Sequence, residues 1–178
     1  MVISMSKIKV DIVGGGLAGL STAISLRNIN KNIEVTVYEK HKKIGYNVEG
    51  RRCGEGHTVE AEWVKWKPSK KSYFNKADTV LTYLGDKTYT AKGRPDVGYI
   101  LNRQEFIYQL GLQAKKLGAK IVTNNKIKSA ENLSGDIIVD ASGCPSTIKR
   151  DLGIDKGLRG LSYQQTPVSY THLRAHET

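Results

Sequence analysis

The chain has 178 residues, which is enough for one ordinary domain with a good hydrophobic core. Hydrophobic residues make up 39% of it, and no apolar run approaches the roughly 20 residues that a bilayer span needs, so a disordered chain and a membrane-spanning one are both excluded. Lysine and arginine number 28 against 17 acids, a net charge of +11. This balance favours acidic partners such as nucleic acid, anionic lipid headgroups or phosphate-bearing substrates, although a lysine-rich solvated surface explains it equally well.

The N-terminal residues, the two cysteines and the spacing of the lysines narrow the possible locations and partners of the protein. Residues 1–5 lack the long apolar core of a signal peptide, so we expect a cytoplasmic protein. Cys53 and Cys144 are too far apart in sequence for a zinc-type pair, and no metal-ligand cluster is seen. The lysines are dispersed and no nucleic-acid-binding motif accompanies them, so nucleic acid is not an expected partner.

Residues 7–39 predict the unit that binds the adenosine diphosphate half of a dinucleotide. A mostly apolar run over residues 8–13 suits a buried parallel strand. Gly14 allows a tight turn after it, Gly16 lets the backbone approach a pyrophosphate, and Gly19 lets the following helix lie close to the strand.

The same unit continues with a helix over about residues 17–28, whose N-terminal amides point at the phosphates, and a strand over residues 33–38. Glu39 ends this strand, 20 positions after Gly19. An acid there accepts both ribose hydroxyls of an adenosine and repels a 2′-phosphate, so we expect no preference for NADP. A glycine turn with no ligand is the alternative, but the strand, helix and acid together favour dinucleotide binding.

The middle of the chain is rich in turns. The loop over residues 45–56 carries four glycines and is either a plain surface loop or a second contact with the same ligand. His41 and His57, on lysine- and glycine-rich loops, are expected to be exposed. Thr58 is a candidate cap for a short helix over residues 59–66. Strands over 77–84 and 87–91 are predicted to form a hairpin around Gly85 and Asp86.

The last part of the predicted domain alternates strands with helices. We predict a strand over 99–101, a helix over about 102–117 that ends at Gly118, short strands over 120–123 and 126–130, a buried strand over 137–140 and a short helix from Ser146 to Leu152. The helix over 102–117 has one apolar face, made of Phe106, Ile107, Leu110, Ala114 and Leu117. This order predicts an α/β Rossmann-like fold, with a central parallel sheet and an additional small antiparallel β element.

Three groups of residues make the chain resemble the flavoprotein reductases of the geranylgeranyl reductase family, and most closely the archaeal digeranylgeranylglycerophospholipid reductases. The first group is residues 14–19 with Glu39 and Lys40. The second, and the most specific, is Ile44 and Gly45 followed by residues 52–56, which resemble the family's cysteine-bearing loop. The third is residues 99–103 with the following helix, together with residues 140–143.

Two departures from the family pattern stand out. Residues 46–51 lengthen the loop before the cysteine, which affects the placement of Cys53, and Ser142 with Gly143 replaces an aspartate–glycine pair. The likeness covers residues 7–154. It implies a glutathione-reductase-type, aromatic-hydroxylase-like FAD-binding domain.

The resemblance implies that FAD is the cofactor. Gly14, Gly16, Ala18 and Gly19 would meet the pyrophosphate, and Glu39 with Lys40 the adenosine ribose. Arg103 would donate to the phosphate or ribityl region, although a helix-surface charge is the alternative, and Ile127 would offer backbone contacts near the adenine. The remaining implied cofactor residues belong to the cysteine-bearing loop and the second glycine signature, namely Arg52, Cys53, Gly54, Gly56, Asp140 and Gly143.

The implied function is an FAD-dependent oxidoreductase that reduces isoprenoid (geranylgeranyl) double bonds of archaeal membrane-lipid precursors at the inner face of the membrane. Its electron donor would be NAD(P)H or ferredoxin. The chain offers no assigned catalytic residue, because Cys53 is either a proton donor, a substrate contact or an inert buried thiol. The alternatives are a flavin-dependent monooxygenase or halogenase of the same fold, and a non-catalytic fragment that binds nucleotide only.

The boundaries of the likeness predict a truncated domain. Residues 5–154 would be the N-terminal part of an FAD/NAD(P)-binding domain, and residues 155–166 the start of a missing second half. Residues 167–178 resemble translated adapter or vector sequence and are interpreted as a non-native tail. We therefore expect an N-terminal fragment with weak or no flavin retention.

Overall fold

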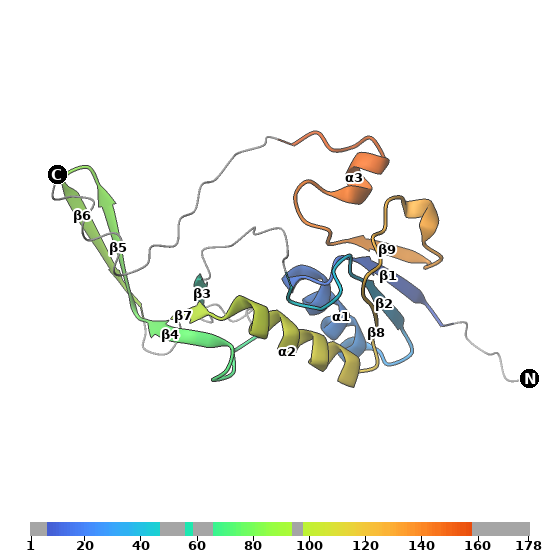
Figure 1. Cartoon of the computed structure of the whole chain (residues 1–178), viewed down its shortest axis with the longest axis horizontal. Helices are drawn as coiled ribbons and strands as arrows, with labels where there is room; N and C mark the ends of the chain where they lie inside the picture. The colour runs from blue at the N-terminus through green and yellow to red at the C-terminus, as the bar shows by residue number, and fades with distance from the viewer. Residues whose placement is uncertain (1–6, 47–55, 59–65, 94–97, 158–178) are drawn as a thin grey trace, which may run out of the picture.

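A computed structural model describes residues 7–46, 56–58, 66–93 and 98–157 of the chain. Its centre is a four-stranded parallel sheet in the order β8-β2-β1-β9. The four strands are β1 (Lys9–Val13), β2 (Glu34–Tyr38), β8 (Lys120–Val122) and β9 (Ile137–Asp140). Crossovers separate all of them along the chain, as parallel pairing requires, and the predicted central parallel sheet is confirmed (Figure 1).

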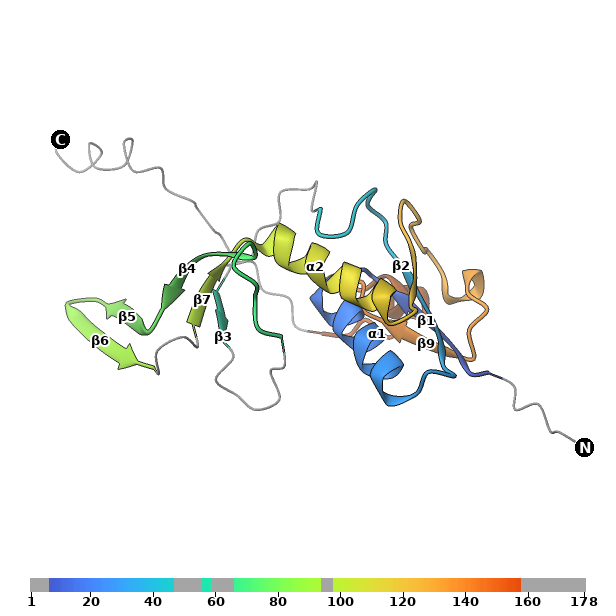
Figure 2. The ribbon, with the colours of Figure 1, turned by 90° about the horizontal axis from the view of Figure 1, so that it is seen from below.

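Two helices, α1 (Leu17–Ile29) and α2 (Arg103–Lys116), pack side by side against this sheet (Figures 1 and 2). The predicted apolar face of α2 is confirmed, with Leu117 half-buried at its end. Asn102 caps α2 by accepting from the Glu105 amide at 3.4 Å. One apolar core joins β1, β2, α1 and α2, since its fully buried members include Ile12, Leu20, Val37 and Ala114.

The antiparallel part lies at the N-terminal end of α2. A three-stranded sheet runs in the order β3-β7-β4, from β3 (Gly56–Thr58), β7 (Gly98–Leu101) and β4 (Tyr73–Ala77). A hairpin of β5 (Thr79–Leu84) and β6 (Lys87–Lys92) turns at Gly85 and Asp86 as predicted and extends away from the body (Figure 2). The predicted fold, α/β with a small antiparallel element, is confirmed.

Several predicted elements differ from the structure around the antiparallel part. The chain between residues 73 and 84 forms two strands, β4 and β5, that meet at Asp78, where the sequence predicted one strand from residue 77. Tyr73 anchors β4, because its ring meets the Tyr99 ring edge-on at 5.1 Å and Tyr99 is buried. Thr58 ends β3, and residues 59–65, predicted to be helical, lie outside the described residues.

The segment over residues 126–130 is not the predicted strand. The chain turns at Asn124, which has a φ of 54°, and then only Ile127 is buried, against Val13 and Ile148. A 3₁₀ helix η1 (Ala130–Asn132) follows, capped by Ser129. The strand over residues 137–140 forms, but it is not buried. Ile137 and Ile138 are 51% and 37% exposed because β9 is an edge strand of the described sheet. The helix α3 (Thr147–Asp151) follows with Ser146 as its N-cap, as predicted.

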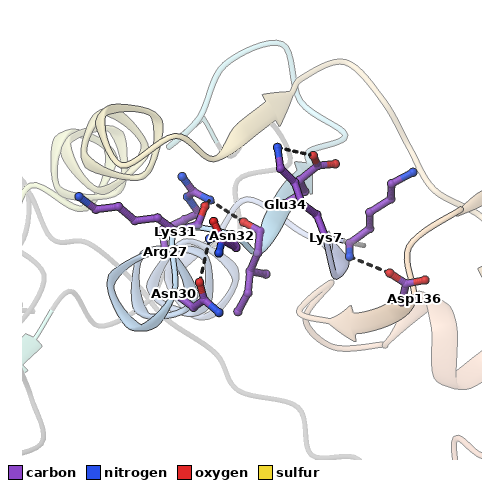
Figure 3. Close-up of polar contacts among 9 residues, drawn as sticks. Lys7, Arg27, Asn30, Lys31, Asn32, Glu34 and Asp136 are labelled. Carbon is purple, nitrogen blue, oxygen red and sulfur yellow. Dashed lines mark hydrogen bonds and ion pairs between the residues drawn. The ribbon is translucent and has the colours of Figure 1, made fainter. Parts of the chain in front are cut away.

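Arg27 ties the end of α1 to two neighbouring segments. Its Nε donates to the Leu117 carbonyl at 2.8 Å. One terminal nitrogen donates to the Lys31 carbonyl at 2.6 Å and to the Ile33 carbonyl (Figure 3). These carbonyls belong to the end of α2 and to the turn that leads into β2. One guanidinium therefore fixes the helix pair and the start of the second strand.

Replacing Arg27 by alanine is expected to lower the free energy of unfolding by about 1–3 kcal/mol, because three carbonyls lose a charged donor at a partly buried site. Urea unfolding followed by far-UV circular dichroism measures the change. Lys31→Ala is the matched control, because Lys31 contributes only its backbone carbonyl to this contact. An equal loss in both variants would contradict the assignment.

Candidate functional site

The glycine turn between β1 and α1 is held by backbone contacts on both sides. The Gly14 amide donates to the Tyr38 carbonyl at 2.8 Å, and Gly14 has a φ of 109°. A Cβ added there would lie 2.3 Å from the Ala141 carbonyl oxygen. A Cβ added at Gly19 would lie only 1.9 Å from the Gly14 carbonyl oxygen. Gly14 and Gly19 are therefore required by packing, as the sequence indicated for the turn and the helix approach.

Gly16 is different, because it faces open space. A Cβ added at Gly16 would have no atom of the described chain within 4 Å. Gly16 is the N-cap of α1, no side chain of the described residues caps this end, and no acid stands in the first turn. The first amides of α1 are thus left for an outside acceptor, and the absence of a side chain leaves room for it. Ala18, in this first turn, is exposed.

Glu39 lies at the carboxyl end of β2, beside the turn. It is only 8% exposed, and its Oε2 accepts from the Gly15 amide at 2.8 Å. Its Oε1 accepts from the His41 amide at 2.8 Å and lies 2.6 Å from His41 Nδ1. A carboxylate has about four lone-pair positions, and these contacts use three of them. The predicted ribose contact is compatible with the remaining capacity and stays a prediction.

The expected exposure of both histidines is wrong. The His41 side chain is 18% exposed. Residues 124–125 run beside its backbone, because the Asn124 amide donates to the His41 carbonyl and the Asn125 amide to the Glu39 carbonyl. His57 is half-buried, with Nε2 2.9 Å from the Trp66 carbonyl oxygen and its ring 5.2 Å from the Phe106 ring. Lys40, between Glu39 and His41, is exposed.

Asp140 ends β9 on the same side of the sheet. Its carboxylate accepts from the Ser142 amide at 3.1 Å, from the Ser142 hydroxyl at 2.6 Å and from the Ser146 hydroxyl. Burial alone would raise the pKa of Asp140, but these hydrogen bonds outweigh it and hold the pKa below its usual value. The carboxylate thus fixes the turn that carries Gly143, which has a φ of 91° and open space around it.

The structure brings most of the predicted cofactor residues to one edge of the sheet. Gly14, Gly16, Gly19, Glu39 and Gly143 lie at the carboxyl ends of β1, β2 and β9, where ligands bind in open parallel sheets. The cofactor roles of these residues stay predictions.

The other predicted cofactor residues are less close to the glycine turn. Arg103 is the first residue of α2, exposed, and makes no hydrogen bond or ion pair with the described part of the chain. Ile127 is buried through its side chain, and Gly56 begins β3 with open space around it. Arg52, Cys53 and Gly54 lie outside the described residues.

Two residues have packing or loop-holding roles that the sequence did not indicate. Ile44 is buried between the glycine turn and α2, since a Cβ on Gly15 would lie 2.6 Å from it and a Cβ on Gly111 2.9 Å. Asp11, buried within β1, accepts from the Ser134 and Gly135 amides at 3.1 and 2.8 Å and so holds the loop before β9. An acid inside an apolar strand was the signal for Asp11.

Tyr38 shares the environment of Asp11. Burial raises the pKa of the Tyr38 phenol, and the Asp11 charge and the hydrogen bond to Asp11 raise it further. The phenol therefore stays neutral at physiological pH and donates to the carboxylate. This pair lies within the sheet and supports the geometry of β1 and β2.

No group of three or more histidine, cysteine or acidic side chains within the described ranges could hold a metal ion. No helix in that part of the chain has the length and apolar character needed to cross a bilayer.

Comparison with known proteins supports the fold and the family likeness. Residues 12–76 match a family described as an NAD(P)-binding Rossmann-like domain. The chain is 26% identical over 172 residues to a digeranylgeranylglycerophospholipid reductase of Methanothrix thermoacetophila, covering 84% of this chain. It spans 43% of that relative, less than half its length.

Solved structures agree with this likeness. A geranylgeranyl bacteriochlorophyll reductase-like protein from Thermoplasma acidophilum superposes with a TM-score of 0.56 and 26% identity, over 66% of this chain and 30% of that one. A flavin-dependent halogenase superposes with a TM-score of 0.64 over 84% of this chain and 32% of its own, but at 21% identity it supports the fold alone. The resemblance to geranylgeranyl reductases expected from the sequence is confirmed.

Gly16 and Gly19 allow a paired test of the glycine turn. We expect Gly16→Val to cost only about 1 kcal/mol of unfolding free energy, since valine is a poorer N-cap than glycine, and to weaken ADP binding at least about tenfold, because the added side chain fills the open space. Gly19→Ala is expected to cost about 2 kcal/mol or more, since its Cβ meets backbone. Urea unfolding and isothermal titration calorimetry measure the two effects. Unchanged ADP affinity in Gly16→Val would show that the open space is not a phosphate site.

Asp140 makes the stability of the chain depend on pH. Because its folded pKa lies below the ordinary value of 3.8, its stabilisation is present above about pH 4 and is lost as the pH falls through the folded pKa. The stability difference between the wild type and Asp140→Asn should therefore shrink between pH 6 and pH 3 in urea unfolding. Asp86→Asn, at the exposed hairpin turn, is the matched carboxyl-to-amide control. A difference that stays constant across this range would contradict the role of Asp140.

Proposed function

We propose that this chain is the nucleotide-binding part of an FAD-dependent oxidoreductase of the geranylgeranyl reductase type. The observation that carries the proposal is the open backbone at Gly16, at the uncapped start of α1, with the Glu39 carboxylate at the end of the adjacent strand. Open space and free amides suit a pyrophosphate, and an acid one strand away suits a ribose. The chain spans 43% of its digeranylgeranylglycerophospholipid reductase relative, so the activity of the whole relative enters here only as part of the proposal.

In this proposal, different residues of the chain contact different parts of FAD. Gly14, Gly16, Ala18 and Gly19 would leave the amides of the turn and of α1 to the pyrophosphate, and Glu39 with Lys40 would hold the ribose. Gly143 would offer its backbone at the neighbouring strand end, on a turn fixed by Asp140. Ile127 and Arg103 would meet the adenine and the phosphate or ribityl region, and Arg52, Cys53, Gly54 and Gly56 the flavin side.

Within this division, the residues around Glu39 set its orientation. Gly15 and His41 hold the two carboxylate oxygens in place before any ligand arrives, so little conformational freedom is lost on binding. When bound, the flavin would supply the hydride for reduction of a carbon–carbon double bond.

The proposed substrate class is an isoprenoid chain of an archaeal membrane-lipid precursor. The likeness to a digeranylgeranylglycerophospholipid reductase and to a geranylgeranyl bacteriochlorophyll reductase-like protein supports this class. The net charge of +11 suits an anionic lipid and a peripheral position at the inner face of the membrane. Either NAD(P)H or ferredoxin would serve as the external electron donor.

The preference of the ribose site follows from the charge of Glu39. We expect ADP to bind the chain at least about tenfold more tightly than 2′,5′-ADP, because the buried carboxylate repels a 2′-phosphate. Competition calorimetry with the two nucleotides measures the ratio, and Glu39→Gln should reduce it. Equal affinities in the wild type would place the ribose away from Glu39.

The 178-residue chain is expected to bind ADP but to lose FAD during purification, because the open backbone at Gly16 and the Glu39 carboxylate suit the ADP half of the cofactor. The flavin absorbance per protein after gel filtration measures retention. Isolation of a stoichiometric yellow protein would contradict this expectation and would support a cofactor site that is complete in this chain.

The activity is tested on the full-length protein encoded in the source genome. Under anaerobic conditions, with reduced flavin, a geranylgeranyl lipid should gain two hydrogens per double bond in mass spectrometry. Gly16→Val in the same protein is the matched control and should lose this activity together with FAD. Oxygen-dependent consumption of NADPH with transfer of oxygen to a substrate, and no lipid reduction, would instead support the monooxygenase alternative.

A further inference from the structure

A basic pocket lies between α3 and the segment that precedes η1. Its volume is about 390 Å³, and it is lined by Lys126, Lys128, Thr147, Arg150 and Asp151. Both walls lie on the same side of β9 (Figure 1). None of these residues belongs to the glycine turn or to the Glu39 cluster, so this pocket has its own lining.

The two walls are joined to each other. Asp151 Oδ2, on α3, accepts from the Ser129 hydroxyl at 2.9 Å and from the Ala130 amide at 3.0 Å. Ile127 and Ile148 are buried in one small apolar cluster with Val13. The spacing of the pocket is therefore fixed by a hydrogen-bonded clamp and by a shared core.

The burial of Ile127 and Ile148 also sets the positions of the basic side chains that line the pocket. Ile127 points into the small core, so Lys126 and Lys128 on either side of it are exposed. Ile148 of α3 is buried in the same small core, whereas Arg150, two residues later, is exposed. Three cationic side chains from two segments thus converge on one pocket.

The charges of the pocket are poorly balanced within the described chain. Lys126 and Lys128 have no ion pair there, and the one acid of the lining, Asp151, already accepts two hydrogen bonds. Arg150 uses its Nε on the Ser146 carbonyl at 3.3 Å, which leaves its two terminal nitrogens as donors. The Thr147 hydroxyl has no partner in the described chain and adds a neutral donor.

This set of donors suits one class of ligand. A planar carboxylate is satisfied by one guanidinium fork, whereas a phosphate ester presents several oxygens and up to two negative charges to donors from different directions. Two ammonium groups, one guanidinium and one hydroxyl on two walls match the second geometry. The net positive charge of the chain would draw such an anion to the surface.

We propose that the pocket of Lys126, Lys128, Thr147 and Arg150 is a phosphate-ester binding site, separate from the phosphate site of the glycine turn. Its ligand is either a soluble phosphate ester or the headgroup of an anionic phospholipid. The proposal does not depend on the proposed function, because it uses no residue of the turn.

The experiment uses the full 178-residue chain carrying Gly16→Val, which removes the glycine-turn phosphate site from the measurement. Inorganic phosphate is titrated by isothermal calorimetry into this protein and into the same protein with Lys126→Gln, Lys128→Gln and Arg150→Gln. The charge-matched control carries Lys115→Gln, Lys116→Gln and Lys120→Gln, three exposed lysines on α2 and β8. We expect saturable binding that weakens about tenfold or more in the pocket variant and less than about threefold in the control.

A second arm identifies the source of the phosphate. Sedimentation with vesicles of phosphatidylglycerol, compared with phosphatidylcholine, supports a lipid headgroup if binding is lost in the pocket variant and kept in the control. Phosphate binding without vesicle binding supports a soluble ester. No saturable phosphate binding, or equal loss in the two triple variants, overturns the proposal. If the pocket variant fails to fold by circular dichroism, Arg150→Lys and Arg150→Gln replace it, and only the glutamine variant should lose binding.

Discussion

The structure depends on one steric constraint, the contact of backbone with backbone where α1 crosses the end of β1. The space for a Cβ at Gly19 is taken by the Gly14 carbonyl oxygen, and the space at Gly14 by the Ala141 carbonyl oxygen. Helix, turn and the end of β9 therefore touch without any side chain between them. The close approach brings the start of α1 to the same edge of the sheet as Glu39 and Gly143, which is what makes this edge suitable for a ligand.

Carboxylates hold the loops at both ends of the sheet. At this edge Glu39 holds the amides of Gly15 and His41, and Asp140 holds the turn that precedes α3. Asp11 holds the loop that enters β9, at the amino end of that strand. In each case a buried or half-buried acid accepts backbone amides, which are donors that the loop itself could not satisfy. Although the overall charge of the protein is strongly positive, these three acidic side chains serve to fix the conformations of loops.

Much of this architecture could be predicted from local pattern. Apolar runs, the glycine spacing and the acid after β2 located the first unit, and the apolar face of α2 located its packing, because these signals act within one element. The errors have another cause. The exposure of β9 and the burial of His41 depend on which segments lie beside them. Residues 126–130 alternate like a strand but pair with no strand in the part of the chain that the structure describes. Ile44 likewise matters through a contact between elements distant in sequence.

The β5–β6 hairpin is expected to unfold separately from the rest of the molecule, with its own, smaller free energy of opening. All of its residues are exposed, so its opening removes no side chain from the core of the α/β body. An isolated two-stranded hairpin is marginally stable in water. Its amide hydrogens should therefore exchange with solvent through local opening, independently of α1, α2 and the parallel sheet, which open together. A single free energy of unfolding describes the body of the protein, and the hairpin forms a separate cooperative unit.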